Sequence, residues 1–176
     1  MAEESKKTRK VEIVPFDKAR TLKIILSMND SDCAECLSYI DCEAIRHCVD
    51  PFYLIVNDSR KALPQWLLRP NVTILNLKKD FDRRGEIITA EADRFLGMDS
   101  DLLFALTNDY SPIVETLTLR AESGFKVGPK FSQGSHPFDF EIGIDGKPEG
   151  HGLVDIFIEK IGTFYKIVTA SQSKQH

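Results

Sequence analysis

The chain lacks any long uninterrupted apolar run. Its first ten residues, MAEESKKTRK, are charged from the third position, and no later stretch approaches the roughly 20 apolar residues of a membrane span. An excess of basic residues is also missing, since 23 Lys and Arg face 27 Asp and Glu, mixed along the chain, for a net charge of −4. Without a basic stripe to neutralise phosphates, nucleic acid is an unsuitable partner. We therefore expect a cytoplasmic protein that contacts neither membrane nor nucleic acid.

Several catalytic motifs are missing as well. No G-x-G-x-x-G follows the first apolar run, no G-x-x-x-x-G-K-[ST] occurs, and neither G-x-S-x-G nor H-E-x-x-H is found. These patterns carry dinucleotide binding, P-loop hydrolysis, α/β-hydrolase chemistry and zincin proteolysis respectively. All four activities therefore lose their usual sequence support.

What is present is the composition of an ordinary globular domain. The 176 residues are 42% hydrophobic and 28% charged, which is enough chain to bury one core without disulfides or metals. Residues 1–10 and 170–176 are polar and without periodicity. We predict a polar tail at each end and a single domain over residues 11–169.

Short apolar runs alternate with helix-like segments along this domain. That alternation is typical of helices packed on both faces of a parallel sheet. The sequence predicts a three-layer α/β domain of Rossmann-like or flavodoxin-like outline, with a mostly parallel sheet of five or six strands. The expected strands are Leu22–Met28, Phe52–Val56, Val72–Leu77, Leu102–Thr107, Phe125–Val127 and Phe138–Ile144.

Four segments between and after these runs have helical signals. Residues Cys33–Val49 repeat apolar side chains at steps of three and four, which places Cys33, Cys36 and Cys48 on one buried stripe. A short helix is expected after Thr89, with Gly97 as its stop, and another where Ser111 can cap and Pro112 can begin a helix. The segment from Leu153 predicts an amphipathic helix that covers the sheet and buries Phe164, Tyr165 and Val168.

Three strands end in the same dipeptide, Asn-Asp. The acids are Asp30, Asp58 and Asp109, and parallel strands would bring them to the same edge of the sheet. Converging carboxylates suit a hard cation, so one hypothesis is a Mg²⁺ or phosphate site, with Mg²⁺ as the one cofactor the chain suggests. The alternative is that Asn and Asp cap helices and turns at these positions.

Cys33 and Cys36 would lie at the start of a helix, where backbone N–H groups stabilise a thiolate. A thiol oxidoreductase is therefore a hypothesis, although the acids around the pair oppose ionisation. Burial is the alternative, because free cysteine is among the most buried residue types. A zinc site with Cys42 and Cys48 is excluded by geometry, since Cys33 and Cys48 would be about 22 Å apart along one helix. Cys42 should be exposed on the opposite face.

The second half of the chain carries a recognisable order of segments. These include Asp101, Leu102 and Leu103 in one strand, and Ser123, Phe125, Lys126, Val127 and Gly128 in a later segment. Over about residues 75–170 the chain resembles an uncharacterised bacterial family of small α/β proteins, classified as a domain of unknown function. The resemblance implies the fold and supplies no chemistry.

With no nucleophile–base pair and no complete ligand set readable from the chain, the leading hypothesis is a non-catalytic binding or assembly module for an unknown protein or small molecule. The first alternative is a Mg²⁺-dependent phosphoryl-transfer or phosphate-binding enzyme that uses Asp30, Asp58 and Asp109. The second is a thiol oxidoreductase that acts through Cys33 and Cys36.

Overall fold

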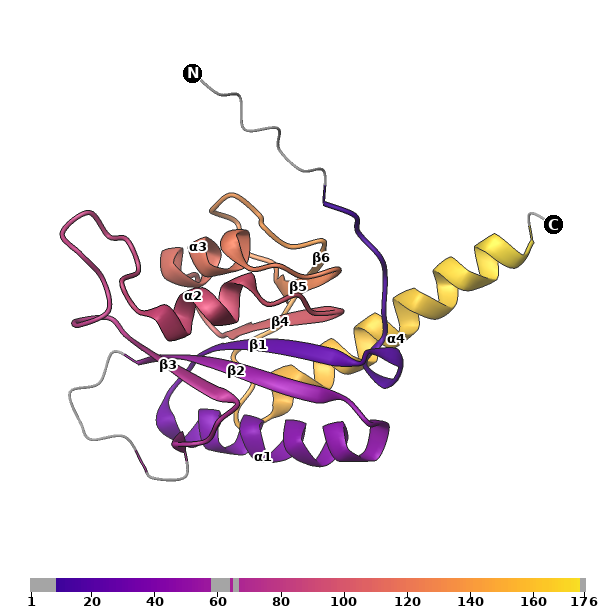
Figure 1. The fold of residues 1–176 in the computed structure, drawn as a ribbon. Coiled ribbons are helices and arrows are strands. Elements are labelled where there is room, and N and C mark those ends of the chain that lie inside the picture. The colour runs from indigo at the N-terminus through magenta and orange to yellow at the C-terminus, as the bar shows by residue number, and fades with distance from the viewer. Residues whose placement is uncertain (1–8, 58–63, 65–66, 175–176) are drawn as a thin grey trace, which may run out of the picture.

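Among the residues that the structure describes, six strands form one parallel sheet in the order β3-β2-β1-β4-β5-β6 (Figure 1). The computed structural model describes residues 9–57, 64 and 67–174. The elements are η1 (Phe16–Lys18), β1 (Thr21–Ser27), α1 (Asp30–His47), β2 (Asp50–Asn57), β3 (Val72–Asn76), α2 (Ala90–Gly97), β4 (Leu102–Thr107), α3 (Pro112–Arg120), β5 (Lys126–Pro129), β6 (Phe140–Ile142) and α4 (Gly152–Ser173). The predicted α/β fold with a parallel sheet is confirmed.

Helices cover both faces of the sheet, as Figure 1 shows, with α1 and α4 on one side and α2 and α3 on the other. Alternate residues of β1 point to opposite faces, so Leu22, Ile24 and Leu26 join the core under α1 and α4. Ile25 joins the second core under α2 and α3. Because both faces are buried, the central strands are rich in apolar residues, which makes them readable as apolar runs, although β1 also contains the fully buried Lys23.

The helix boundaries follow local capping chemistry. The Asn29 side chain accepts a hydrogen bond from the Asp32 N–H at 2.8 Å, which starts α1. Ser111 accepts from the Val114 N–H at the start of α3, with Pro112 in the first turn, as predicted. Gly97 is the last residue of α2, and the next residue, Met98, is extended. The α2 helix therefore ends without a left-handed glycine.

Cys48 departs from the prediction. It was expected on the buried stripe of α1, but it lies one residue beyond the helix, exposed and in the left-handed conformation with φ 56°. There the Cys48 and Val49 N–H groups bond to the carbonyls of the last turn, to Ile45 and Ala44. The predicted helix, to Val49, is two residues too long, because the chain leaves the helix through the left-handed conformation of Cys48.

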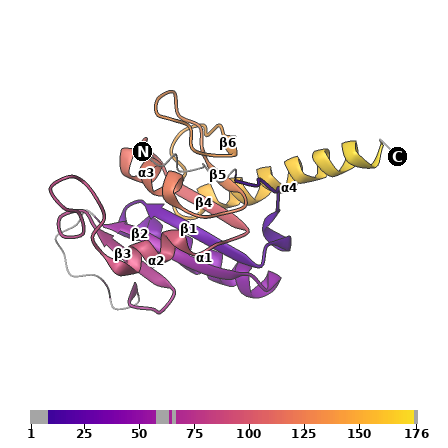
Figure 2. The same ribbon diagram turned by 45° about the horizontal axis from the view of Figure 1, so that its top comes forward.

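The last helix, α4, extends beyond the sheet (Figures 1 and 2). Leu153, Val154, Phe157 and Ile161 are buried in its first half. Phe164 is half-buried and stacks on Phe140 of β6 with ring centroids 4.7 Å apart. Beyond that point the sheet ends, and Ile167 is 59% exposed. The helix continues to Ser173, past residue 169, where the domain was predicted to end.

Candidate functional site

The carboxyl edge of the sheet carries three adjoining hollows. All three are lined by Ser111, in the turn between β4 and α3. The strand order changes direction at β1 and β4, and the helices that follow these two strands, α1 and α3, cover opposite faces. Helices that diverge in this way leave a crevice above the strand ends, which is where parallel α/β proteins bind ligands.

The largest hollow, which we call the apolar hollow, has a volume of about 530 Å³. It lies above the ends of β1 and β2 and beside the start of α3. Its apolar lining comes from the β1–α1 turn, the end of β2, the segments flanking β3 and the first turn of α3, as Met28, Ile55, Val56, Pro64, Leu67, Leu77 and Ile113. This size falls within the range of small-molecule pockets.

The second hollow, the polar hollow, has a volume of about 480 Å³ and lies between the β1–α1 turn, the β4–α3 turn and the segment Lys147–Glu149. Lys147 Nζ pairs with Asp109 Oδ1 at 2.8 Å at its rim. The Oδ1 of Asn108, which lines this hollow, is buried and has no hydrogen-bond partner within the described part of the chain. The polar hollow therefore carries an ion pair at its rim and lies beside a buried acceptor that no described residue satisfies.

The strands themselves end in neutral hydrogen-bonding side chains. Asn57 of β2 pairs in register with Asn76 of β3, and Ser27 of β1 pairs in register with Thr107 of β4. The Thr107 hydroxyl donates to the Asp109 carbonyl at 2.8 Å. The floor of the crevice thus presents amides and hydroxyls rather than charges.

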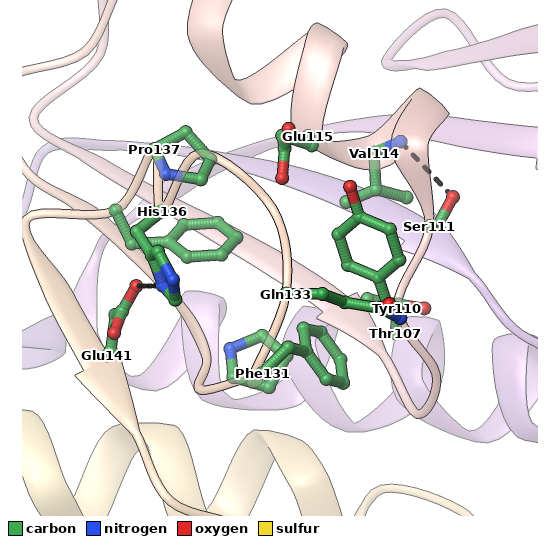
Figure 3. A pocket seen from close by; sticks show the side chains of 12 residues that line it. Thr107, Tyr110, Ser111, Val114, Glu115, Phe131, Gln133, His136, Pro137 and Glu141 are labelled. Atoms are coloured by element: carbon green, nitrogen blue, oxygen red, sulfur yellow. Dashed lines mark hydrogen bonds and ion pairs between the residues drawn. The ribbon is translucent and has the colours of Figure 1, made fainter.

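The third hollow, the aromatic pocket, lies beside α3 under the loop that joins β5 to β6 (Figure 3). It holds about 20 Å³, the space of one water-sized group. Tyr110 and Phe131 meet edge to face, with ring centroids 6.0 Å apart. Glu115 accepts a hydrogen bond from the Ser135 N–H at 3.0 Å, and this contact holds the loop over the pocket.

Two features of this loop explain why it lies so close to the wall of the aromatic pocket. Gly134 has φ 99°, and a side chain there would collide with Glu115 and Tyr110. His136, on the other side, pairs with Glu141 of β6, with Nδ1 and Oε1 2.7 Å apart (Figure 3). A glycine at residue 134 therefore lets the loop backbone lie directly on the pocket wall.

Two of the three predicted acidic residues, Asp30 and Asp109, line different hollows. Asp30 lines the apolar hollow from the first turn of α1, and Asp109 lines the polar hollow, where Lys147 neutralises it. Asp58 lies outside the described residues. Within the part of the chain that the structure describes, no group of three or more His, Cys, Asp or Glu side chains could hold a metal ion.

Cys33 and Cys36 are buried in α1, with exposed fractions of 4% and 0%. The Cys36 thiol donates to the Gly150 carbonyl, with Sγ 3.3 Å from the oxygen. Burial, opposed by a hydrogen bond with the Met28 backbone and assisted by the charges of Asp30 and Asp32, raises the pKa of Cys33 to about 11. Burial, followed by the charges of Cys33 and of nearby acids, raises the pKa of Cys36 to about 12. Both thiols are thus protonated at neutral pH, the opposite of an activated pair.

The glycine-rich segment 143–152 closes the junction between α1 and α4. The Gly150 N–H donates to Asp32 Oδ1 at 2.8 Å. His151 stacks on Tyr39 with ring centroids 4.3 Å apart and lies between Glu35 and Asp155, at 3.2 and 3.3 Å. The Gly150 N–H and the His151 ring of this segment are thus engaged by acids of α1 and α4.

The sequence interpretation missed the residues of the aromatic pocket. Tyr110, Glu115, Phe131 and Glu141 come from a turn, a helix, a loop and a strand separated by up to 31 positions, and no local spacing links them. Ser111 was identified only as a helix cap. Its place at the centre of the crevice depends on which strands lie beside β4.

The fold and the crevice define an open parallel α/β protein with a hollowed carboxyl edge. The chain belongs to a family of unknown function (DUF6913), which matches residues 2–152. The match includes the first third of the chain with its cysteines, which the resemblance over residues 75–170 did not cover. It ends where α4 begins. No curated protein and no solved structure is found to be similar to the chain. Among the described residues, no helix combines the length and apolar character of a membrane span.

Proposed function

We propose that the protein is a non-catalytic binding module that takes a small molecule at the carboxyl edge of its sheet. The observation that carries this proposal is the meeting of three hollows at Ser111, where α1 and α3 diverge. The strand order is that of Rossmann-like sheets, in which the reversal point is the usual ligand crevice. Such sites are concave and largely apolar, with a few polar groups that fix orientation.

The lining indicates an amphipathic ligand. Met28, Ile55 and Ile113 would contact an apolar part in the apolar hollow. Ser27 would bond a hydrogen-bonding part in the polar hollow. Each such contact requires only a preformed surface, so the role needs no reactive group.

The two catalytic alternatives receive less support from the geometry. A thiol oxidoreductase needs a thiolate near neutral pH, whereas burial and neighbouring acids raise the pKa values of Cys33 and Cys36. A Mg²⁺-dependent enzyme needs converging carboxylates, whereas Asp30 and Asp109 line different hollows.

We also propose a cytoplasmic location. All four cysteines are free thiols, and two of them, Cys42 and Cys48, are exposed. Exposed free thiols persist best in a reducing compartment, which supports this location.

Native mass spectrometry of the protein purified from its own cells tests the binding role. Ile113→Trp places a large ring in the apolar hollow, while Thr116→Trp puts the same ring on the exposed side of the same helix. Wild type and Thr116→Trp should retain the same added mass, and Ile113→Trp should lose it. Compounds that bind should likewise raise the melting temperature of wild type and of Thr116→Trp, but not that of Ile113→Trp.

The proposal would be wrong if the added mass persisted in Ile113→Trp, because the ligand would then lie elsewhere. It would also be wrong if wild type retained no ligand and no screened compound stabilised it more than Ile113→Trp.

A further inference from the structure

The lining of the three hollows is acidic. Asp30 lines the apolar hollow, three further carboxylates line the polar hollow, and two line the aromatic pocket. Among these described lining residues, Lys147 is the one lysine or arginine. Lys147 is already paired with Asp109. An anionic ligand would meet like charge here, whereas a cation would be attracted.

The two carboxylates of the aromatic pocket come from different elements, Glu115 from α3 and Glu141 from β6. Glu115 accepts from the Ser135 N–H, and Glu141 pairs with His136. A carboxylate can accept about four hydrogen bonds, so both groups keep capacity for a further donor. Asn108 Oδ1, in the neighbouring polar hollow, is a buried acceptor that also suits a donor.

Aromatic rings complete the wall. Figure 3 shows Tyr110 and Phe131 beside the space toward which Glu115 points. Ring faces carry partial negative charge and attract ammonium groups within about 6 Å of the centroid. Removal from water and the negative charge and hydrogen bond of Glu115 raise the pKa of Tyr110.

We propose that the aromatic pocket binds the primary ammonium group of a small organic amine. The rest of the amine would pass Tyr110 and Ser111, which line both this pocket and the polar hollow. This inference rests on the proposed binding function and names the class of ligand. The volume of about 20 Å³ accommodates one –NH₃⁺ group and is too small for a quaternary ammonium or a phosphate.

A single water molecule has nearly the same size as –NH₃⁺, so the test must separate charge from volume. Butylammonium chloride, 1-butanol and tetramethylammonium chloride are titrated into ¹⁵N-labelled protein at constant ionic strength. Butylammonium should shift the backbone amide signals of Gly134 and Ser135, in the loop over the pocket. Neither 1-butanol, which lacks the charge, nor tetramethylammonium, which exceeds the volume, should do so.

Glu115→Gln removes the charge and keeps an acceptor for the Ser135 N–H. It should weaken butylammonium binding at least about tenfold, because a charge-assisted hydrogen bond is lost. Glu91→Gln, the matched change in the first turn of α2, should leave the affinity unchanged. Phe131→Leu should also weaken binding, while Phe131→Tyr should preserve it, since only the second keeps a ring face. The same spectra report whether each variant is folded.

Equal affinity in Glu115→Gln and wild type would overturn the assignment, as would equal shifts from 1-butanol or tetramethylammonium. If butylammonium gave no shifts while an added mass was still lost in Ile113→Trp, the amine would be refuted and the binding role retained. If both results were negative, both proposals would fail.

Discussion

The buried thiols of Cys33 and Cys36 make the stability of the protein depend on pH in a way that can be calculated. In the unfolded chain each thiol loses its proton around its ordinary pKa of 9.0, whereas in the folded protein the pKa values are about 11 and about 12. Between pH 9 and 11 the unfolded state therefore binds fewer protons than the folded state. The stability that these thiols contribute is complete below pH 9 and is lost as pH rises through that interval.

The magnitude follows from the size of the pKa shifts. One pKa unit corresponds to about 1.4 kcal/mol, so at pH 10 each thiol should have removed about 1.4 kcal/mol from the free energy of unfolding, or about 3 kcal/mol for the pair. Because both side chains are almost fully buried, solvent screening reduces this value little. An activated redox pair with lowered pKa values would instead increase the free energy of unfolding as pH rises.

Urea unfolding followed by circular dichroism, under reducing conditions at several pH values from 7 to 10, measures the effect. Other groups titrate in this range, so the quantity of interest is the difference between wild type and the double variant Cys33→Ala/Cys36→Ala. The advantage of wild type should shrink by about 3 kcal/mol across the range. Cys42→Ala, which removes an exposed thiol, should instead follow wild type in parallel. A constant difference between wild type and the double variant would refute the assignment of high pKa values to these thiols.

Three further predictions concern other parts of the fold. A thiol reagent at neutral pH should modify the exposed Cys42 and Cys48 before the buried pair, as peptide mapping by mass spectrometry would show, and faster labelling of either buried thiol would contradict the structure. The fully buried Lys23 has a pKa lowered to about 8, mainly by burial. Between pH 8 and 10.5 the unfolded state therefore binds more protons at this side chain than the folded state does. Wild type should therefore gain about 3 kcal/mol relative to Lys23→Met as pH rises through that interval, measured by the same unfolding assay, and parallel curves would argue against the shift. Gly150→Ala introduces a side chain at φ 58° against Glu35 and should lower stability by about 1–3 kcal/mol in thermal unfolding, whereas Gly143→Ala, with open space around it, should be near neutral.

The strands and most helices were predictable because their signals are local. Leu102–Thr107 is an apolar run of six residues, and it forms β4 with the same bounds. The hydroxyl of Ser111 and the ring of Pro112 define the start of α3 through contacts within one turn. Such features depend on neighbours a few positions away, so the sequence contains them directly.

Helical periodicity gave wrong burial predictions near the ends of two helices, where the chain leaves the helix or the helix extends past the sheet. The apolar stripe of α1 seemed to include Cys48, but the chain leaves the helix at His47. The stripe of α4 continues past Phe164, and whether it is buried depends on how far the sheet extends beneath it. Among the described residues no strand lies beyond β6, so Tyr165 and Val168, which were predicted to be buried, are only half-buried, and Ile167 is exposed.

The sequence by itself determined the class of fold, the capping of α1 and α3 and the burial of Cys33 and Cys36, since each follows from local pattern and hydrophobicity. Only the tertiary structure decided which strand ends meet. Pairing β1 with β4 brings Asn29 and Ser111 together, although 82 positions separate them, and it leaves Asp30 and Asp109 in different hollows. Strand pairing is a choice among long-range contacts whose free energies come from the whole packed core, and no short stretch of sequence encodes it.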